Sequence, residues 1–461
     1  MVLAETTQKQ TGYDYLQEIK ASPNQSLLPI TAKVNDRGHL EIGGCDVTEL
    51  VKQFGSPLYI MDEHSIRTAC SQYRDGLKDH YQGESLVIYA SKALNCLALC
   101  ALVNSEGLGI DVASGGELYT ALQAGVDPEK IYFHGNNKSV AELEQAIECG
   151  CTIVADNWLE LKTLASFNAN HAPKVMLRIT PGIECHTHEY IRTGHLDSKF
   201  GFDPNQVPEV LDFLTKTSNL DFVGVHAHIG SQIFERQPHQ DLAGVLVKWL
   251  KAAQELGLPA RELNVGGGLG IRYTEADDPP SITEWTSAVA KAVTMACEQL
   301  QVSLPKLICE PGRSLVGNTG ITAYTVGARK EVPEIRTYIA VDGGMSDNAR
   351  PITYQAEYRS MLGNKMSETA TETVTVAGKH CESGDILIQS ASLPKTVSGD
   401  TLVITSTGAY GYSMASNYNR LLRPGMVLVY KGTADMMVER ETYQDLIAQD
   451  KLPERLKTVD N

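Results

Sequence analysis

Between Leu86 and Glu310 the chain alternates short apolar runs with polar or glycine-rich corners and helical stretches, and this unit occurs eight times. The apolar runs are LVIYASK, GLGIDVAS, KIYFHGN, CTIVADN, KVMLRIT, DFVGVHAHIG, ELNVGGG and KLICEPG. Strands that alternate with helices are typical of a parallel sheet, and eight units over roughly 250 residues predict a closed (β/α)8 barrel of the TIM type.

One helix has both of its ends marked in the sequence. Ser139 and Glu142 form a capping box at the start of VAELEQAIEC, and Gly150 supplies the left-handed residue at which a helix ends. The apolar residues of this segment, which include Leu143 and Ile147, fall on one helical face. We expect that face to cover the sheet.

After EPGRSLVGN the alternation stops, and closely spaced β-branched and aromatic runs follow. They are GITAYTVGARKEV, RTYIAVDGG, TETVTVAGKHC, DTLVITSTGAY and MVLVYKGTADMMVE. Such runs predict a second, mostly antiparallel β-barrel or sandwich domain, so the fold class is α/β plus β. The text LEIGGCDVTELVKQFGSPLYIMD predicts a strand, a short helix and a strand that join it, whereas SMLGNKMSETATET is polar and predicts a loop.

These patterns divide the chain into four parts. They are a polar N-terminal arm at 1–25, N-terminal strands that join the β domain at 26–64, the barrel at 65–325 and the C-terminal β domain at 326–461. A chain of 461 residues is long enough to bury a large core in the barrel and to form a second domain.

Composition narrows the class of protein. A net charge of -16 argues against non-specific nucleic-acid binding, which depends on lysine and arginine at phosphates. The ten cysteines form no paired CxxC set, which favours a reduced cytoplasmic protein without structural zinc. The opening residues have no apolar signal region, and no apolar run is long enough to span a membrane.

Polar side chains stand where the predicted barrel strands end. They are Lys92, Asp111, His134, Asp156, Arg178, His228, Gly266 to Gly268, Glu310 and Arg313. The catalytic residues of such barrels come from this edge, so the set predicts an active site. Asp111 and Arg178 have a simpler interpretation as ion partners at the barrel mouth.

Lys92 and the glycine-rich run NVGGGLG together suggest a cofactor. A lysine at a strand end is either a surface residue or, when desolvated, a nucleophilic amine. Glycines after the seventh strand let backbone N–H groups approach an anion, and a helix that starts there would add its dipole. An amine beside a phosphate cradle suggests pyridoxal 5'-phosphate held by Lys92 as a Schiff base.

Glu310 agrees with this hypothesis. A carboxylate at the end of the eighth strand could keep the pyridine nitrogen of the cofactor protonated, and a protonated ring is a strong electron sink suited to α-decarboxylation. The alternative is a structural ion pair between Glu310 and Arg313.

The run HAHIGSQ offers His228 as a ring stacked on the cofactor and Ser231 as a hydroxyl for its phosphate. His226 and His228 share a face, so metal ligation is an alternative, but no third ligand with suitable spacing is visible and we predict no metal. Cys381, in the polar text HCESGD, is either a proton donor or an ordinary turn cysteine.

At this point the chain resembles the diaminopimelate decarboxylases, within the alanine-racemase-like (fold type III) group of pyridoxal-phosphate enzymes. The resemblance runs from about Pro57 to Tyr430 through YASKA, GLGIDVASGGEL, FHGNNKS, RTGHLDSKFGF, HIGSQ, NVGGGLG, EPGRSLVG, DGGMSDNARPITY, CESGD and TGAYGYSMASNYN. The lysine motif departs from the more frequent AVKAN, because Ser91 and Leu94 replace Val and Asn.

The resemblance implies roles for particular residues. Lys92 and Cys381 would be catalytic, the cysteine reprotonating Cα after carbon dioxide leaves. The cofactor would be bound by Lys92, Asp111, His228, Ser231, Gly266, Gly267, Gly268, Glu310, Pro311, Gly312, Arg313 and Tyr410. The substrate meso-2,6-diaminopimelate would be held by Arg313, Arg350, Tyr354, Glu382 and Tyr410. The resemblance also implies a homodimer whose partner subunit supplies Cys381 and Glu382, and L-lysine as the product.

Two alternatives remain at this stage. A relative that decarboxylates ornithine or arginine has no distal carboxylate to bind, which would leave Arg350 as an unmatched charge. A catalytically silent regulator on the same fold would not need Lys92, Cys381 and Tyr410 together. An alanine racemase needs a cation at the pyridine nitrogen, and Glu310 has the opposite charge.

Overall fold

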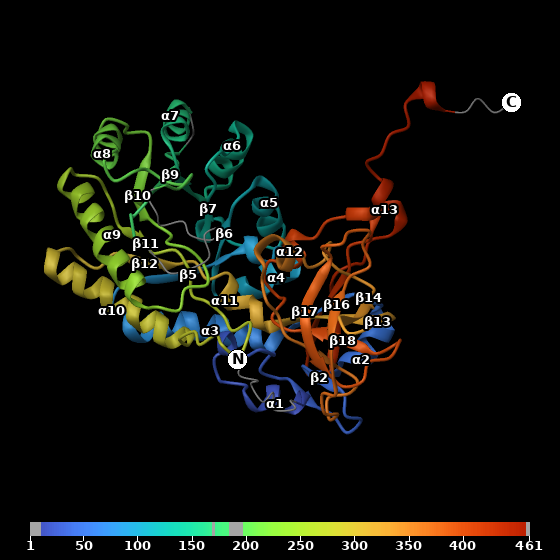
Figure 1. The fold of residues 1–461 in the computed structure, drawn as a ribbon. Helices are drawn as coiled ribbons and strands as arrows, with labels where there is room; N and C mark the ends of the chain where they lie inside the picture. Colours follow the sequence, from blue (N-terminus) through green and yellow to red (C-terminus); the bar gives the residue numbers. More distant parts are fainter. Residues whose placement is uncertain (1–10, 168–170, 184–196, 458–461) are drawn as a thin grey trace.

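A computed structural model describes residues 11–167, 171–183 and 197–457 of the chain (Figure 1). Eight parallel strands close into a barrel, with β12 paired to β5. The strands are β5 (Ser85–Ala90), β6 (Gly109–Val112), β7 (Ile131–Phe133), β8 (Thr152–Ala155), β9 (Lys174–Arg178), β10 (Asp221–His226), β11 (Glu262–Asn264) and β12 (Lys306–Cys309). Each coincides with one of the eight apolar runs, except that β5 begins one residue earlier, so the predicted (β/α)8 barrel is confirmed.

Helices surround the barrel, and the last position of this ring is filled by a helix that precedes the first barrel strand. They are α3 (Glu63–His80), α4 (Leu97–Ser105), α5 (Gly115–Gln123), α6 (Val140–Cys149), α7 (Trp158–Ser166), α8 (Val207–Thr215), α9 (Gln237–Glu255) and α10 (Ile282–Leu300). After β12 the chain forms only the short α11 (Arg313–Val316) before it leaves the barrel. Helix α3, which precedes the first barrel strand, packs beside α10 and fills that position (Figure 1).

Helix α6 has the ends that the sequence predicts. Ser139 and Glu142 form the capping box, and Gly150 adopts the left-handed conformation with φ 82°. Leu143 and Ile147 are buried. The predicted ends of the helix are confirmed. They could be predicted because each end depends on hydrogen bonds within a few residues, which the local sequence determines.

The β domain is built around one large, mostly antiparallel sheet. Its order is β17 (Ile386–Leu393), β16 (Glu372–Ala377), β14 (Arg336–Val341), β13 (Gly320–Val332), β4 (Leu58–Asp62), β19 (Gly425–Tyr430) and β20 (Thr433–Val438). Strand β18 (Thr401–Ile404) pairs with β13 and with β15 (Ser360–Leu362). The β4–β19 and β14–β16 pairs are parallel, and the other pairs are antiparallel.

The N-terminal segment contributes to two sheets. Strands β1 (Lys33–Val34), β2 (Leu40–Ile42) and β3 (Cys45–Asp46) form a small sheet of their own, next to α2 (Val47–Phe54). Strand β4 instead lies inside the large sheet between β13 and β19. The predicted arm at 1–25 lies partly outside the described residues, and α1 (Gly12–Gln17) falls in its described part. The four domain boundaries stay a prediction.

One predicted loop is a strand in part. Ser360–Leu362 of SMLGNKMSETATET is the buried strand β15, held by its pairing with β18. Three residues are too few to show an alternating pattern, so a strand held by a distant partner leaves no local signal. The edge strand β17 is also missing from the predicted runs, although five of its eight residues, ILIQSASL, are apolar.

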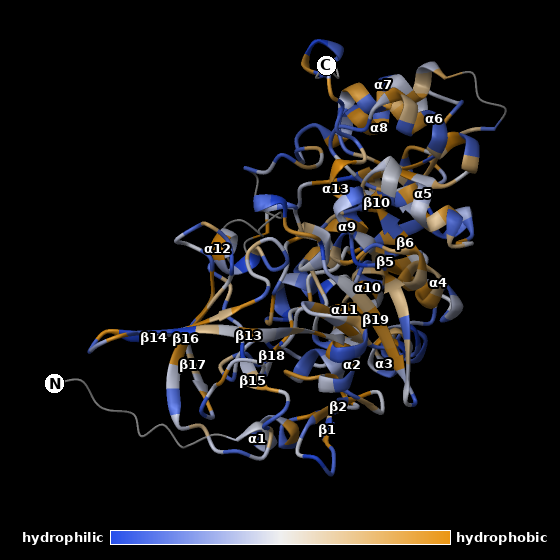
Figure 2. Cartoon of the chain, turned by 90° about the vertical axis from the view of Figure 1, so that its right-hand side faces the viewer, coloured by the Kyte–Doolittle hydropathy of each residue, from blue (hydrophilic) through white to orange (hydrophobic). Residues whose placement is uncertain are grey.

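Helix α4 lies between the barrel and the β domain. It contacts β6 and α5 on the barrel side and β20 on the other side. Figure 2 shows it as one of the most hydrophobic helices, as expected for a helix covered on several faces. No helix within the described ranges is both long and apolar enough to cross a membrane.

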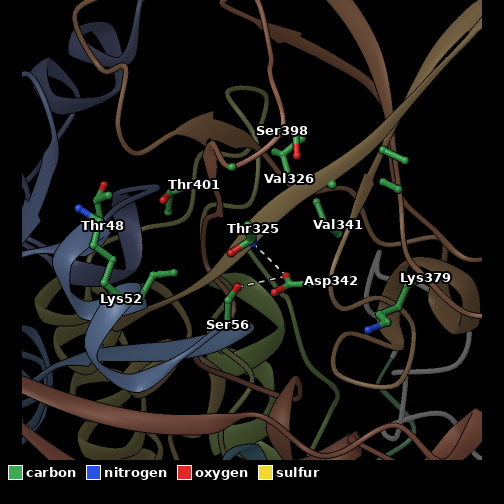
Figure 3. Close-up of a pocket in the computed structure, with 15 residues that line it drawn as sticks. Thr48, Lys52, Ser56, Thr325, Val326, Val341, Asp342, Lys379, Ser398 and Thr401 are labelled. Carbon is green, nitrogen blue, oxygen red and sulfur yellow. Dashed lines mark hydrogen bonds between the residues drawn. The ribbon is translucent and has the colours of Figure 1, made fainter.

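A large cleft lies away from the barrel mouth. It has a volume of about 760 Å³ and runs between α2 and the β13–β14 pair (Figure 3). Asp342 there accepts hydrogen bonds from Ser56 Oγ and the Thr325 backbone N–H. The predicted site residues, all of which are described, do not line it.

Candidate active site

A second cavity, of about 280 Å³, lies at the carboxyl ends of the barrel strands. The predicted site residues that line it are Lys92, Asp111, His228, Ser231, Glu310, Arg313, Arg350, Tyr354 and Tyr410. His134, Arg178, Phe200 and His226 also line it. The structure thus brings residues from the barrel and from the β domain to one place, where barrel enzymes carry out their chemistry.

The end of β5 positions Lys92 and ties it to the β domain. Lys92 occupies the short turn Ser91–Ala93 that directly follows the strand. The carbonyl of Ala93 accepts hydrogen bonds from the Tyr410 backbone N–H at 2.8 Å and from Ser413 Oγ at 3.1 Å. Tyr410 adopts a left-handed φ of 57°, which is unusual for this residue type. The strained turn brings Tyr410 to the wall of the cavity.

Glu310 is a buried carboxylate with three polar neighbours. Its oxygens lie 2.7 Å from Asn264 Nδ2, 2.8 Å from His134 Nε2 and 3.1 Å from His226 Nε2. Burial alone raises the pKa of Glu310, but His134 and His226 more than offset this and hold it well below its usual range. Arg313 donates instead to Ser231 Oγ and Tyr273 OH, so the predicted alternative of a Glu310–Arg313 ion pair is wrong.

The two histidines of HAHIG have different partners. His226 faces Glu310, and burial lowers the pKa of His226 to about 4. Since a carboxylate oxygen only accepts, His226 Nε2 carries the proton. His228 Nδ1 accepts the backbone N–H of Gly267 at 3.2 Å, which turns its ring toward the glycine-rich run. His134 lies beside this pair, and His134, His226 and Glu310 have ligand atoms within 4.8 Å of one another.

Asp111 and Arg178 stand at the rim as buried charged residues. Arg178 lies 3.6 Å from Asp156 and stacks 4.3 Å from the centre of the Phe200 ring. Asp111 lies 3.7 Å from His134, and burial raises the pKa of Asp111 to about 6. Arg178 therefore has the ion partner that the simpler interpretation proposed.

A small annex of about 40 Å³ adjoins the cavity, with Gly268 and Gly312 in its wall. Gly268 has φ +123°, and a Cβ on Gly267 would lie 2.2 Å from the carbonyl oxygen of Glu310. Only glycine fits these positions, so bare backbone reaches the annex. Gly266 and Pro311 line neither cavity, and their carbonyls accept the N–H groups of Glu310 and Ala90.

No helix begins directly after the glycine-rich run, contrary to the prediction. The next helix, α10, starts at Ile282. The intervening segment is held by Asn24, whose Nδ2 donates to the carbonyls of Gly270 and Pro280. This anchor comes from the N-terminal segment, and its effect could not be read from the run itself.

Behind the annex lies His239 of α9, a buried histidine whose ring nitrogens have no hydrogen-bond partner among the described residues. Burial lowers the pKa of His239 to about 4. Unfolded histidine titrates near pH 6.5, so the unfolded chain binds more protons between pH 6.5 and pH 4 and stability falls as the pH drops through this window. At pH 5 the loss due to this residue is about 2 kcal/mol.

We therefore expect His239→Leu to lose less stability than the wild type between pH 7 and pH 5. Denaturant unfolding at both pH values measures the difference. Tyr132→Phe, a change at another buried ring, is the control. An equal loss in the wild type and in His239→Leu would contradict the assigned titration.

Comparison with known proteins agrees with this geometry. The sequence model described as "Pyridoxal-dependent decarboxylase, pyridoxal binding domain" matches residues 63–317, more than half of the chain. The chain is 62% identical over 445 residues to a diaminopimelate decarboxylase of Synechocystis sp., covering 94% of this chain and 95% of the relative. It is 46% identical over 438 residues to the diaminopimelate decarboxylase of Bacillus subtilis, covering 91% and 97%.

The chain belongs to the diaminopimelate decarboxylase family of pyridoxal-dependent enzymes. A solved diaminopimelate decarboxylase of M. jannaschii, in complex with L-lysine, is 35% identical and superimposes with a TM-score of 0.85 over 93% of this chain and 99% of the other. The resemblance seen in the motifs is confirmed, and with it the PLP-dependent carboxy-lyase class.

The residues of this decarboxylase fit pyridoxal phosphate. An ionised, buried Glu310 suits a protonated pyridine nitrogen. The annex offers glycine backbone and the Ser231 hydroxyl, which suit a phosphate. Lys92 borders both cavities, so its amine can reach a group that occupies them.

Cys381 and Glu382 are the predicted site residues that stand apart. Both are exposed, on the loop between β16 and β17, and neither lines the cavity that contains Lys92. The loop is held by His380 Nδ1, 2.6 Å from Asp385 Oδ2, while Asp385 also accepts the Met345 N–H. In this chain these two groups are therefore held in place but lie away from the site.

Sequence reasoning placed His134 at a strand end without giving it a partner, and it missed Asn264, which also stands at a strand end. Both contact Glu310. Tyr273 and Tyr358, which contact the arginines, lie in irregular segments with no local signal. Residues 184–196, which include the first part of RTGHLDSKFGF, lie outside the described residues.

Proposed function

We propose that this chain catalyses the decarboxylation of meso-2,6-diaminopimelate to L-lysine and carbon dioxide, as a cytoplasmic homodimer with its sites at the interface. The proposal rests mainly on a pair of buried guanidiniums, Arg313 and Arg350, in the same cavity as Lys92 and Glu310. In the part of the chain that the structure describes, neither guanidinium has a carboxylate within ion-pair distance. A substrate carboxylate would supply it.

Each residue has a physical task in this reaction. Lys92 would supply the amine that holds the cofactor, and Glu310 would keep the proton on its pyridine nitrogen. His228 would contact the ring, and Ser231, Gly268 and Gly312 would bind the phosphate. When bound, pyridoxal phosphate supplies the electron sink that lets the bond from Cα to the carboxylate break.

The distal end of the substrate carries a carboxylate and an ammonium group, so its binding requires residues of both charges. Arg350 and Tyr354 stand one turn apart on α12 (Arg350–Tyr354) and line the cavity with Arg313. A guanidinium pairs bidentately with a carboxylate, and Glu382 of the partner subunit would pair with the distal ammonium. Cys381 of the partner subunit would deliver the proton to Cα.

A homodimer agrees with the position of these last two groups. Tyr418 stacks 5.9 Å from His380 beside the exposed Cys381, so the loop is firmly built although it lies outside the cavity of its own chain. A cytoplasmic location is supported by the free thiols of the nine described cysteines, because a reducing compartment preserves them.

Product analysis tests the substrate. We expect lysine from meso-diaminopimelate and no amine product from ornithine or arginine. Arg350→Ala should lower kcat/KM for meso-diaminopimelate at least tenfold, because it removes a buried charge-assisted contact worth on the order of 2 to 5 kcal/mol. The absorbance of bound cofactor should stay normal.

The exposed pair Arg359 and Glu275 provides a control. Their salt bridge spans 2.7 Å on partly exposed side chains, so Arg359→Ala should change kcat/KM less than twofold. Turnover of ornithine at the rate of diaminopimelate, or an Arg350→Ala enzyme with wild-type kcat/KM, would show that the distal carboxylate is not read here.

A further inference from the structure

One phenol lies between the two arginines of the site. Tyr273 OH accepts a hydrogen bond from Arg313 Nη1 at 2.6 Å and another from Arg350 Nη1 at 2.8 Å. Arg313 comes from the end of a barrel strand and Arg350 from α12 of the β domain. A single oxygen atom thus joins the two halves of the expected carboxylate site.

Tyr273 contacts the arginines from outside the cavity around Lys92. It does not line the cavity around Lys92, whereas it lines a neighbouring cavity of about 300 Å³ together with Arg350 and Tyr354. Its side chain therefore does not lie in the space that a substrate would occupy, and its effect on a substrate must pass through the guanidiniums.

The pair of cations needs such an acceptor. Arg313 and Arg350 are buried, and like charges held close together in a medium of low polarity repel each other. Among the described residues no carboxylate lies within ion-pair distance of either, so the phenol oxygen is the acceptor that they share. Burial alone raises the pKa of Tyr273, but the two guanidiniums more than offset this and lower it below its usual value.

Each arginine has a further contact that fixes its plane. Arg313 Nε donates to Ser231 Oγ at 3.1 Å, and Arg350 Nη1 donates to Tyr358 OH at 2.6 Å. The Tyr273 and Tyr358 rings meet edge to face at 5.3 Å. Tyr273 is thus itself held rigidly, and it holds two side chains that otherwise have several rotatable bonds each.

We propose that Tyr273 is a specificity-determining positioning residue, whose hydroxyl oxygen holds Arg313 and Arg350 at the spacing needed to bind one distal carboxylate between them. The inference rests on the proposed function, because it assigns the arginines to that carboxylate. Orientation fixed before binding avoids the entropy cost of ordering two long side chains when the ligand arrives.

Two ligands that differ by one carboxylate isolate this role. L-lysine carries the distal carboxylate, and 1,5-diaminopentane lacks it. In calorimetric titrations of the pyridoxal-phosphate holoenzyme, we expect Tyr273→Phe to raise the Kd of L-lysine at least tenfold and to change that of 1,5-diaminopentane less than twofold. The absorbance of bound cofactor should not change. Turnover should show the same selectivity, with a rise in KM for meso-diaminopimelate that exceeds the fall in kcat.

Tyr132→Phe is the matched control. Tyr132 is also buried, and its hydroxyl donates to Glu262 Oε2 at 2.8 Å near the other end of the barrel. Its loss should leave both Kd values within twofold of the wild type. A Tyr273→Phe enzyme that keeps the wild-type preference for L-lysine overturns the proposal.

Tyr358→Phe keeps the proposal testable if Tyr273→Phe does not fold. It removes an acceptor from Arg350 alone and leaves the shared oxygen in place, so the Kd of L-lysine should rise less than threefold. A tenfold rise would show that Tyr273 does not hold the pair and would overturn the proposal. A wild-type enzyme that binds the two ligands equally would instead contradict the proposed substrate, which separates the two failures.

Discussion

Replacement of Lys92 by alanine should lower turnover of meso-diaminopimelate by about 10⁴- to 10⁶-fold, the size of loss seen when a covalent nucleophile is removed. Lys92 borders both the main cavity and the annex. Lys138, also buried near this edge, is committed elsewhere, since its ammonium donates to Glu160 and to the carbonyls of Gly135 and Val154. Lys92 is therefore the lysine that we expect to hold the cofactor and to release the product.

Borohydride reduction of the wild-type holoenzyme, followed by peptide mapping, measures where the cofactor is attached. Label on a lysine other than Lys92 would contradict the assignment. Lys92→Arg is the matched control, because it keeps the positive charge but an arginine stays protonated and cannot act as the amine. It should be as inactive as Lys92→Ala. Both variants should unfold at the wild-type denaturant concentration when the cofactor is absent.

Mixed dimers should recover activity from two inactive chains. Cys381 lies outside the cavity of its own chain, so a shared site needs Lys92 from one subunit and Cys381 from the other. Loss of a general acid costs on the order of 10² to 10⁴ in rate, which makes Cys381→Ala homodimers nearly inactive. When Lys92→Ala and Cys381→Ala chains with different tags are produced together and purified through both tags, each heterodimer has one intact site. Roughly half of the wild-type activity should return.

A second heterodimer gives the opposite result. In a dimer of a wild-type chain with a chain that carries both Lys92→Ala and Cys381→Ala, a shared arrangement leaves each site with one missing group. Such dimers should be nearly inactive. If each chain builds its own site, this dimer keeps about half of the activity and the first one has none, by the two-fold symmetry of the assembly.

The barrel could be predicted because its signals repeat and are local. Each strand is a short apolar run, and the ends of α6 depend on residues within one turn. Strand β15 could not be predicted in this way, since its three residues are held by β18, some forty residues further along the chain. The missing helix after the glycine-rich run has the same cause, because Asn24 holds the segment from far away.

The residues of the site divide in the same way, into those that local signals predict and those that distant contacts determine. Lys92, His228 and Glu310 stand at strand ends, and a parallel barrel brings all strand ends together, so their proximity could be expected from the order of the strands. The bonds from the Tyr273 hydroxyl to Arg313 and Arg350 are different. They depend on how an irregular segment and a second domain meet, and no periodicity in the sequence encodes that meeting.

The place of β4 in the sheet has a consequence for how the molecule is assembled. Its neighbours β13 and β19 come only after the last barrel strand has been made. During synthesis β4 therefore leaves the ribosome without a partner, and the barrel can close while this apolar strand is still uncovered. A long sequence separation between paired strands slows folding and leaves unpaired strand edges exposed, where they promote aggregation. The final strands of the chain thus complete the β domain, and a nascent chain that stops before them presents an open sheet edge to chaperones and proteases.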